Sequence, residues 1–141
     1  MQGELLGEAS GRVTGVRALR SDGQGARAGV SFYFEVSFQG TTKLLGAEAS
    51  EFGTYWQVVR PTGVLYGEGE NVMTTADGEI AHWTGFGVGR PTGASPASRW
   101  GVCGSFLAAT GRLERLGTVA NVVEYEVDED WNYRWKLWEW T

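Results

Sequence analysis

One segment of the chain, residues 63–90, gathers most of the side chains that could carry out acid–base chemistry. Its sequence, GVLYGEGENVMTTADGEIAHWTGFGVGR, contains Tyr66, Glu68, Trp83 and the single histidine of the chain, His82. A carboxyl group surrounded by aromatic rings loses hydration, which raises its pKa and lets it exchange protons near neutral pH. The segment therefore indicates either a catalytic site or a pair of strands whose polar side chains face water.

The same segment reads as a β-hairpin, because Asp77 and Gly78 separate two stretches of strand-forming residues. A turn centred on these two residues gives two faces, whose candidate residues are Tyr66, Glu68 and Trp83 on one face and Asn71, His82 and Thr84 on the other. In the first set the tyrosine and the glutamate are catalytic and the tryptophan forms the wall. In the second set the histidine is catalytic and its two neighbours bind substrate. A change of one residue in the turn would exchange the faces of one strand, so the inward face stays open.

Three further residues are predicted to bind a substrate near the strand ends. Tyr55 and Trp56, in the stretch GTYWQ, could close one mouth of a barrel, although aromatic residues in strands often serve packing alone. Arg90 follows GFGVG and is expected at the rim, where it could pair with a carboxylate of a ligand or of the protein itself.

Motifs for cofactors and metals are missing from the sequence. GFGVGR has the spacing GxGxG rather than GxGxxG, and no helix is predicted after it. One histidine and one cysteine, Cys103, cannot build a His/Cys zinc site. The acidic stretch YEVDEDWN lacks the spacing of a calcium-binding loop. We therefore expect no metal and no cofactor, so an enzyme built on this chain would work without either.

Alternation at period two, typical of strands, runs through nearly the whole chain. It is clearest in 29–38, GVSFYFEVSF, where every second residue is apolar. The best helical candidate, 106–117, is interrupted by Gly111. Eight strands are predicted, at about 4–20, 29–38, 42–59, 63–74, 79–90, 98–109, 121–128 and 132–140.

Short connections between consecutive strands favour a single all-β domain over residues 1–141. We predict an eight-stranded antiparallel up-and-down β-barrel with little helix. A β-sandwich is the alternative, but no long crossover connection supports it. The 22 glycines among only 3 prolines suggest bends and close backbone approaches within the strands.

Charge and composition exclude several classes of protein. The net charge is −5 and no run of Lys or Arg exceeds two residues, so nucleic acid is not an expected partner. No apolar stretch is long enough to span a membrane as a helix, and no secretion signal is read at the N-terminus. A single cysteine cannot form an internal disulfide. These features predict a soluble, cytoplasmic protein with no membrane partner.

The C-terminal stretch NYRWKLWEW carries large aromatic residues on both faces of its strand. Trp135 lies on one face, whereas Trp138 and Trp140 lie on the other, together with Arg134 and Lys136. Only one face can be interior, so the other leaves aromatic surface outside. This favours a homo-oligomer, a dimer or a trimer, although the stems of the basic residues could also cover those rings.

The motifs GVLYGEG (63–69), TADGEIAHWTGFGVGR (75–90) and VVEYEVDEDWN…KLWEW (122–140) resemble a family of small uncharacterised bacterial and archaeal proteins, and GTYW (53–56) extends the likeness. That family implies no established activity. The predicted architecture is also similar to allene oxide cyclase-like, or calycin-like, barrels. That second resemblance implies an apolar cavity that folds a reactive substrate without a cofactor, and it implies no particular catalytic residue here.

Three functions fit these features. The first is a cofactor-independent cyclase or isomerase that holds an apolar small molecule, such as a natural-product intermediate, in a cavity of a few hundred Å³. The second is a non-catalytic barrel that binds a small apolar ligand. The third is a structural or interaction protein with a packed core and an aromatic outer face.

Overall fold

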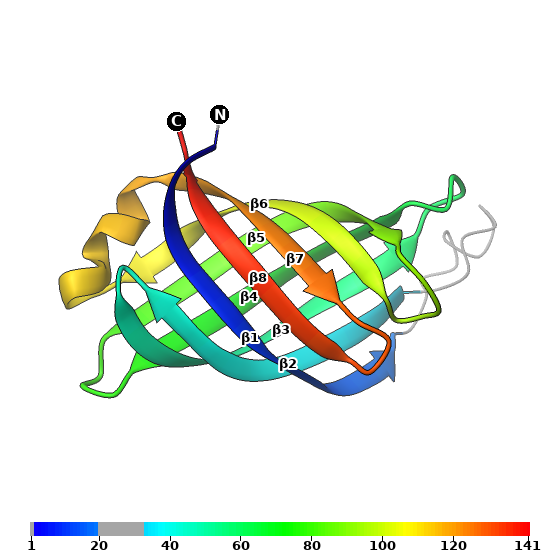
Figure 1. The fold of residues 1–141 in the computed structure, drawn as a ribbon, viewed down its shortest axis with the longest axis horizontal. Coiled ribbons are helices and arrows are strands. Elements are labelled where there is room, and N and C mark those ends of the chain that lie inside the picture. The colour runs from blue at the N-terminus through cyan, green and yellow to red at the C-terminus, as the bar shows by residue number, and fades with distance from the viewer. Residues whose placement is uncertain (1, 20–32) are drawn as a thin grey trace.

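The computed structural model describes residues 2–19 and 33–141, which form a closed β-barrel (Figure 1). Its elements in chain order are β1 (Gln2–Ala18), β2 (Tyr33–Leu44), β3 (Ala47–Val59), β4 (Leu65–Thr75), β5 (Ile80–Pro91), β6 (Ser98–Ala109), the 3-10 helix η1 (Gly111–Thr118), β7 (Ala120–Val127) and β8 (Asn132–Trp140). The prediction of an eight-stranded antiparallel up-and-down barrel with little helix is confirmed, and the sandwich alternative is wrong. Residues 20 and 29–32 of the first two predicted strands lie outside the described residues.

Every strand pairs antiparallel with its neighbour in the sequence, and β1 closes the barrel against β8. Closure leaves none of the described strands with a free edge, which is the feature that makes open sheets prone to association. The alternation predicted for 29–38 is confirmed in its described part. Val36 and Phe38 are buried inside the barrel, whereas Glu35 lies outside and pairs with Arg17.

Glycines make room for large aromatic rings inside the barrel. A Cβ atom at Gly85 or Gly104 would overlap the indole ring of Trp83, and one at Gly89 would overlap the ring of Trp100. These two indole rings therefore lie across strand positions that carry no side chain. The expected close approaches at strand glycines are therefore confirmed, and at Gly53, Gly85, Gly89 and Gly104 the nearest atom belongs to an aromatic ring.

The helix η1 covers one end of the barrel, beside the β4–β5 and β2–β3 turns (Figure 1). Its residues Leu113 and Leu116 are fully buried and extend the apolar core, which also contains Met73, Ala81 and Phe106. The helical candidate 106–117 thus overlaps η1, but β6 continues to Ala109 before the helix begins. Among the described residues no helix is long and apolar enough to cross a membrane.

Candidate functional site

The β4–β5 hairpin has a three-residue loop, 76–78, rather than the predicted two-residue turn. The backbone N–H of Thr75 donates to the carbonyl oxygen of Glu79 at 2.9 Å, so these two residues face each other across the loop. Gly78 has a φ of 91°, a conformation that glycine adopts most easily. A turn that ends in a left-handed glycine is the common three-residue hairpin connection.

The additional loop residue shifts the pairing of the hairpin by one position. Asn71 faces Trp83, whereas the predicted turn would place it opposite Thr84. The prediction of the two faces is therefore wrong, because this shift exchanges the faces of one strand relative to the other. Each of the two candidate sets is divided between the inside and the outside of the barrel.

Tyr66 and Glu68 lie on the outer face of β4. The Tyr66 hydroxyl donates a hydrogen bond to Glu68 Oε2 at 2.7 Å, and Glu68 is exposed. This hydrogen bond raises the pKa of Tyr66, and the guanidinium of Arg60 lies over its ring at 4.3 Å. The interior position of Glu68 that the first set requires is thus contradicted, because the register places its side chain in water.

The outer surface also holds four other predicted residues, His82, Thr84, Arg90 and Trp56. His82 Nε2 lies 2.9 Å from Glu70 Oε1, and both side chains are solvent-accessible. Arg90 is exposed near the end of β5, as expected for a rim residue. None of these four residues contributes a side chain to the barrel interior.

Three of the predicted residues do point inward. One belongs to each candidate set of the hairpin, and the third was predicted to close a mouth of the barrel. Asn71, Trp83 and Tyr55 all line the same interior space. The structure therefore brings together one residue from each alternative, because odd-numbered positions of β3, β4 and β5 share the inner face.

A buried carboxyl group lies at the centre of the barrel, and it is Glu51 rather than Glu68. The side chain of Glu51 is only 3% exposed. Its Oε1 accepts a hydrogen bond from Asn71 Nδ2 at 3.0 Å, while Oε2 accepts from Tyr133 Oη at 2.5 Å and from Trp135 Nε1 at 3.1 Å. Burial raises the pKa of Glu51, and the three donors oppose that shift.

The sequence offered Glu68 of β4 as an interior carboxyl group, whereas the buried carboxyl group that the structure shows is Glu51 of β3. Glu51 alternates with Ala49, Gly53 and Tyr55 along β3, and this row of small and aromatic residues was a usable sign of an inner face. The neighbouring Phe52 obscures that sign, because it is a large apolar residue on the opposite, exposed face.

Tyrosines line the interior beside Glu51. The hydroxyl oxygens of Tyr55 and Tyr125 are 3.1 Å apart, and the rings meet edge to face. Burial raises the pKa of Tyr55 to about 12 and the pKa of Tyr125 well above its ordinary value. Burial also raises the pKa of Tyr133, which therefore stays a hydrogen-bond donor to Glu51 across the physiological range.

Among the described residues, two interior amides each have one polar atom without a hydrogen-bond partner. Trp83 Nε1 donates to Asn121 Oδ1 at 2.9 Å, which leaves Asn121 Nδ2 buried and unpaired. Asn71 Oδ1 is unpaired as well, on the side of the amide opposite Glu51. Buried polar atoms are nearly always paired in folded proteins, so these two atoms are hydrogen-bonding groups that the described residues leave unused.

A cavity of about 90 Å³ adjoins these groups. Part of its wall is backbone, because Gly67 and Gly69 of β4 pair with Gly87 and Gly85 of β5 and leave no inward side chains. The rest of the wall is mainly apolar, and its rings belong to Phe38, Tyr55, Trp83, Trp100, Tyr125 and Trp135. Glu51 lies behind this wall, in contact with Asn71 and Trp135, which both line the space. The volume is smaller than the few hundred Å³ expected.

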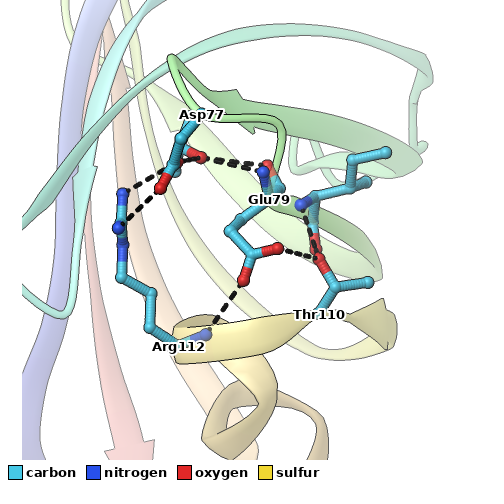
Figure 2. A network of polar contacts seen from close by, with 6 residues as sticks. Asp77, Glu79, Thr110 and Arg112 are labelled. Carbon is cyan, nitrogen blue, oxygen red and sulfur yellow. Dashed lines mark hydrogen bonds and ion pairs between the residues drawn. The ribbon is translucent and has the colours of Figure 1, made fainter.

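Polar contacts hold η1 over one end of the barrel, as Figure 2 shows. The guanidinium of Arg112 makes two hydrogen bonds to the Asp77 carboxylate, at 2.9 and 3.0 Å. Glu79 accepts from the backbone N–H of Arg112 at 3.0 Å and from Thr110 Oγ1 at 3.3 Å. On the other side of η1, Arg115 makes two hydrogen bonds to Glu4 of β1. The end of the barrel is therefore closed by a helix attached to two parts of the wall.

The described residues contain no group of three or more His, Cys, Asp or Glu side chains placed to hold a metal ion. The fold and its interior define a class, the closed eight-stranded up-and-down barrel, here with a buried carboxyl group in an aromatic core.

Solved structures with a similar fold include two proteins of unknown function. The chain is similar to the conserved protein of unknown function RPA1785 from Rhodopseudomonas palustris, with a TM-score of 0.75 and 14% identity over 96% of this chain and 95% of that one. It is also similar to a protein of unknown function from Clostridium acetobutylicum, with a TM-score of 0.78 and 14% identity over 99% and 97% of the two chains. Neither a family model nor a curated protein matches the sequence. These likenesses show the fold alone, and the resemblance based on the sequence motifs stays a prediction.

Proposed function

We propose that this protein binds a small, mostly apolar molecule inside the barrel. The observation that carries the proposal is the cavity of about 90 Å³, which has a glycine wall and aromatic sides. Well-packed interiors contain few voids larger than a water molecule, and apolar cavities of this order bind apolar guests. The single Cys103, which has no disulfide partner in the chain, supports a reducing compartment such as the cytoplasm for this function.

Size favours binding over cyclisation of a large substrate. Enzyme and drug pockets usually measure about 300–1,000 Å³, whereas an engineered cavity of about 150 Å³ holds one benzene ring. A space of about 90 Å³ suits a guest of a few heavy atoms unless the tryptophan rings move. A cofactor-independent cyclase or isomerase is the second candidate, and the observation that favours it is the raised pKa of Glu51 behind the cavity wall.

Xenon is a suitable first probe, because it enters apolar cavities without needing a polar contact. We expect xenon under pressure to shift the NMR signals of Trp83, Val102 and Val123, which line the cavity. Val123→Ile should fill the space and abolish the shifts. Val127→Ile is the matched control, because Val127 is buried on the same face of β7 but does not line the cavity.

The outcomes separate the candidates. If xenon causes no shifts in the wild type, there is no interior binding site. Xenon shifts that persist unchanged in Val123→Ile would refute the site as well. If Val123→Ile does not fold, Val102→Ile fills the same cavity from β6 and serves as the second test. Catalysis further requires that Glu51→Gln abolish turnover of a converted compound while the xenon shifts remain.

A further inference from the structure

The tryptophans that line the cavity use their polar atoms within the protein. These residues are Trp83, Trp100 and Trp135. Their indole N–H groups donate, at 2.9 to 3.1 Å, to side-chain oxygens of Asn121, Ser98 and Glu51 respectively. The three rings therefore offer a guest only apolar surface, because each N–H group already has an acceptor.

Asn71 differs from the other inward-facing residues that line the cavity. Its side chain is 5% exposed, and its Oδ1 has no hydrogen-bond partner among the described residues. The hydroxyl groups of Tyr55 and Tyr125, in contrast, bond to each other at 3.1 Å. The second unpaired atom of the core, Nδ2 of Asn121, belongs to a residue that does not line the cavity. The cavity wall therefore holds one buried acceptor whose capacity is unused.

Glu51 fixes the orientation of the Asn71 amide. The carboxyl group accepts hydrogen bonds from Asn71, Tyr133 and Trp135, so the amide turns its N–H group toward Glu51 and its carbonyl oxygen away from it. Because Glu51 lies behind the cavity wall, Oδ1 is the polar atom of Asn71 that is left for a guest. A carbonyl oxygen can only accept a hydrogen bond, so the guest has to bring the donor.

We infer that the guest is a small neutral alcohol, whose hydroxyl group donates a hydrogen bond to Asn71 Oδ1. This inference rests on the proposed binding function and names the class of its ligand. Glycine backbone and ring faces suit a body of a few carbon atoms, and the hydroxyl supplies the donor that Oδ1 lacks. A buried acceptor without a partner is costly, so pairing it favours the alcohol over a hydrocarbon of the same size. A charged amine could donate as well, but it would lose the hydration of a full charge on entering an apolar space.

2-Propanol and acetone are matched probes of this acceptor. They share a carbon skeleton and have the same number of non-hydrogen atoms, but only 2-propanol has a hydroxyl proton to donate. NMR titration of the intact protein with each probe, followed on Val102 and Val123 of the cavity wall, gives the two dissociation constants. We expect 2-propanol to bind roughly tenfold more tightly than acetone, because acetone leaves Oδ1 unpaired and places a second acceptor beside it.

Asn71→Leu removes the acceptor and keeps nearly the same side-chain shape. In this variant 2-propanol should bind no more tightly than acetone, while the xenon shifts remain. Tyr133→Phe is the matched control, because it also deletes one donor to Glu51 but keeps Asn71 Oδ1, and Tyr133 does not line the cavity. The preference for 2-propanol should persist there. If Asn71→Leu does not fold, the NMR signal of the Asn71 side-chain carbonyl carbon in the wild type tests the same bond: it should shift with 2-propanol and stay nearly unchanged with acetone and xenon.

The outcomes distinguish this inference from the proposed function beneath it. If xenon shifts the cavity signals but 2-propanol binds no more tightly than acetone, the barrel binds guests and Asn71 does not select them, so the inference is overturned alone. Tighter binding of acetone would mean that Asn71 presents Nδ2 to the guest, which overturns it as well. A preference for 2-propanol that survives in Asn71→Leu would assign the selection to another group. If xenon, 2-propanol and acetone all leave the cavity signals unchanged, interior binding itself is refuted.

Discussion

Asn71 donates a hydrogen bond to Glu51 across the β3–β4 pair at 3.0 Å, and both side chains are enclosed by the barrel, at 5% and 3% exposure. The carboxyl group thus lies deep in the protein with three donors around it and no basic residue among them. Desolvation is the largest effect on this group, and it raises the pKa of Glu51 above the value of an unfolded chain.

The raised pKa makes a prediction about stability and pH. Because the folded state binds the Glu51 proton more tightly, this group stabilises the fold fully below its unfolded pKa, and that contribution is lost as pH rises through the folded pKa. Glu51→Gln has no such titration. We therefore expect the stability of the wild type relative to Glu51→Gln to fall as pH rises from about 4. Urea unfolding of both proteins over a pH series measures this difference, and a constant difference would contradict it.

Removal of one donor to Glu51 should destabilise the barrel. Tyr133→Phe deletes the hydroxyl that bonds to Glu51 Oε2 and leaves the buried carboxyl group with two donors. Hydrogen bonds to charged groups contribute about 1.5–3 kcal/mol, so we expect a loss of that order in the free energy of unfolding. Tyr66→Phe is the matched control, because it deletes the same type of bond, to Glu68, on the surface. Its effect should stay within about 0.5 kcal/mol. Equal losses of unfolding free energy in the two variants would show that the interior Tyr133–Glu51 bond stabilises the fold no more than the surface Tyr66–Glu68 bond.

The fold was predictable from the sequence and the site only in part, for one physical reason. Period-two alternation and short turns determine strands and their order, and both are local properties of the chain. The inner face of the β4–β5 hairpin depends instead on whether the loop has two residues or three, and Asp77–Gly78 is compatible with both. That single residue decides that Trp83 is inside with Asn71 and that Glu68 is outside.

Glu51 shows the second limit of sequence reasoning. A glutamate in a strand usually faces water, and its burial here depends on donors from β4 and β8 that are far away in the sequence. Tyr133 and Trp135 share one face of the last strand, but nothing in their own stretch identifies the group to which they donate. Contacts of this kind become visible only when the barrel closes.

The packing of tryptophan against glycine makes a prediction about substitution. A methyl group at Gly85 would overlap the ring of Trp83, which cannot move away without losing its hydrogen bond to Asn121. Overpacking of this kind costs about 1–3 kcal/mol, so Gly85→Ala should lower the free energy of unfolding by that amount. Gly15→Ala is the control, because Gly15 has open space around it and should change stability by no more than about 0.5 kcal/mol. A harmless Gly85→Ala would show that the ring can relocate.

The attachment of η1 makes a prediction about local opening. Arg112→Ala removes both hydrogen bonds to Asp77 but leaves the buried Leu113 and Leu116 in place. Amide hydrogen exchange in 111–118 should therefore become faster, while the global unfolding midpoint changes little, because exposed ion pairs contribute little to global stability. Arg17→Ala, which removes an exposed pair with Glu35 at a distant point of the barrel, should leave exchange in η1 unchanged.

The same attachment should weaken in acid. A hydrogen bond from Thr75 and the charge of Arg112 lower the pKa of Asp77, so its stabilising effect is present at neutral pH and is lost as pH falls through that lowered value. Exchange in 111–118 of the wild type should then approach that of Arg112→Ala at low pH, after correction for the intrinsic pH dependence of exchange. If the two proteins exchange η1 amides at the same rate at neutral pH, the Asp77–Arg112 pair does not hold the helix. Its buried leucines and the contacts of Glu79 and Arg115 then keep that end of the barrel closed.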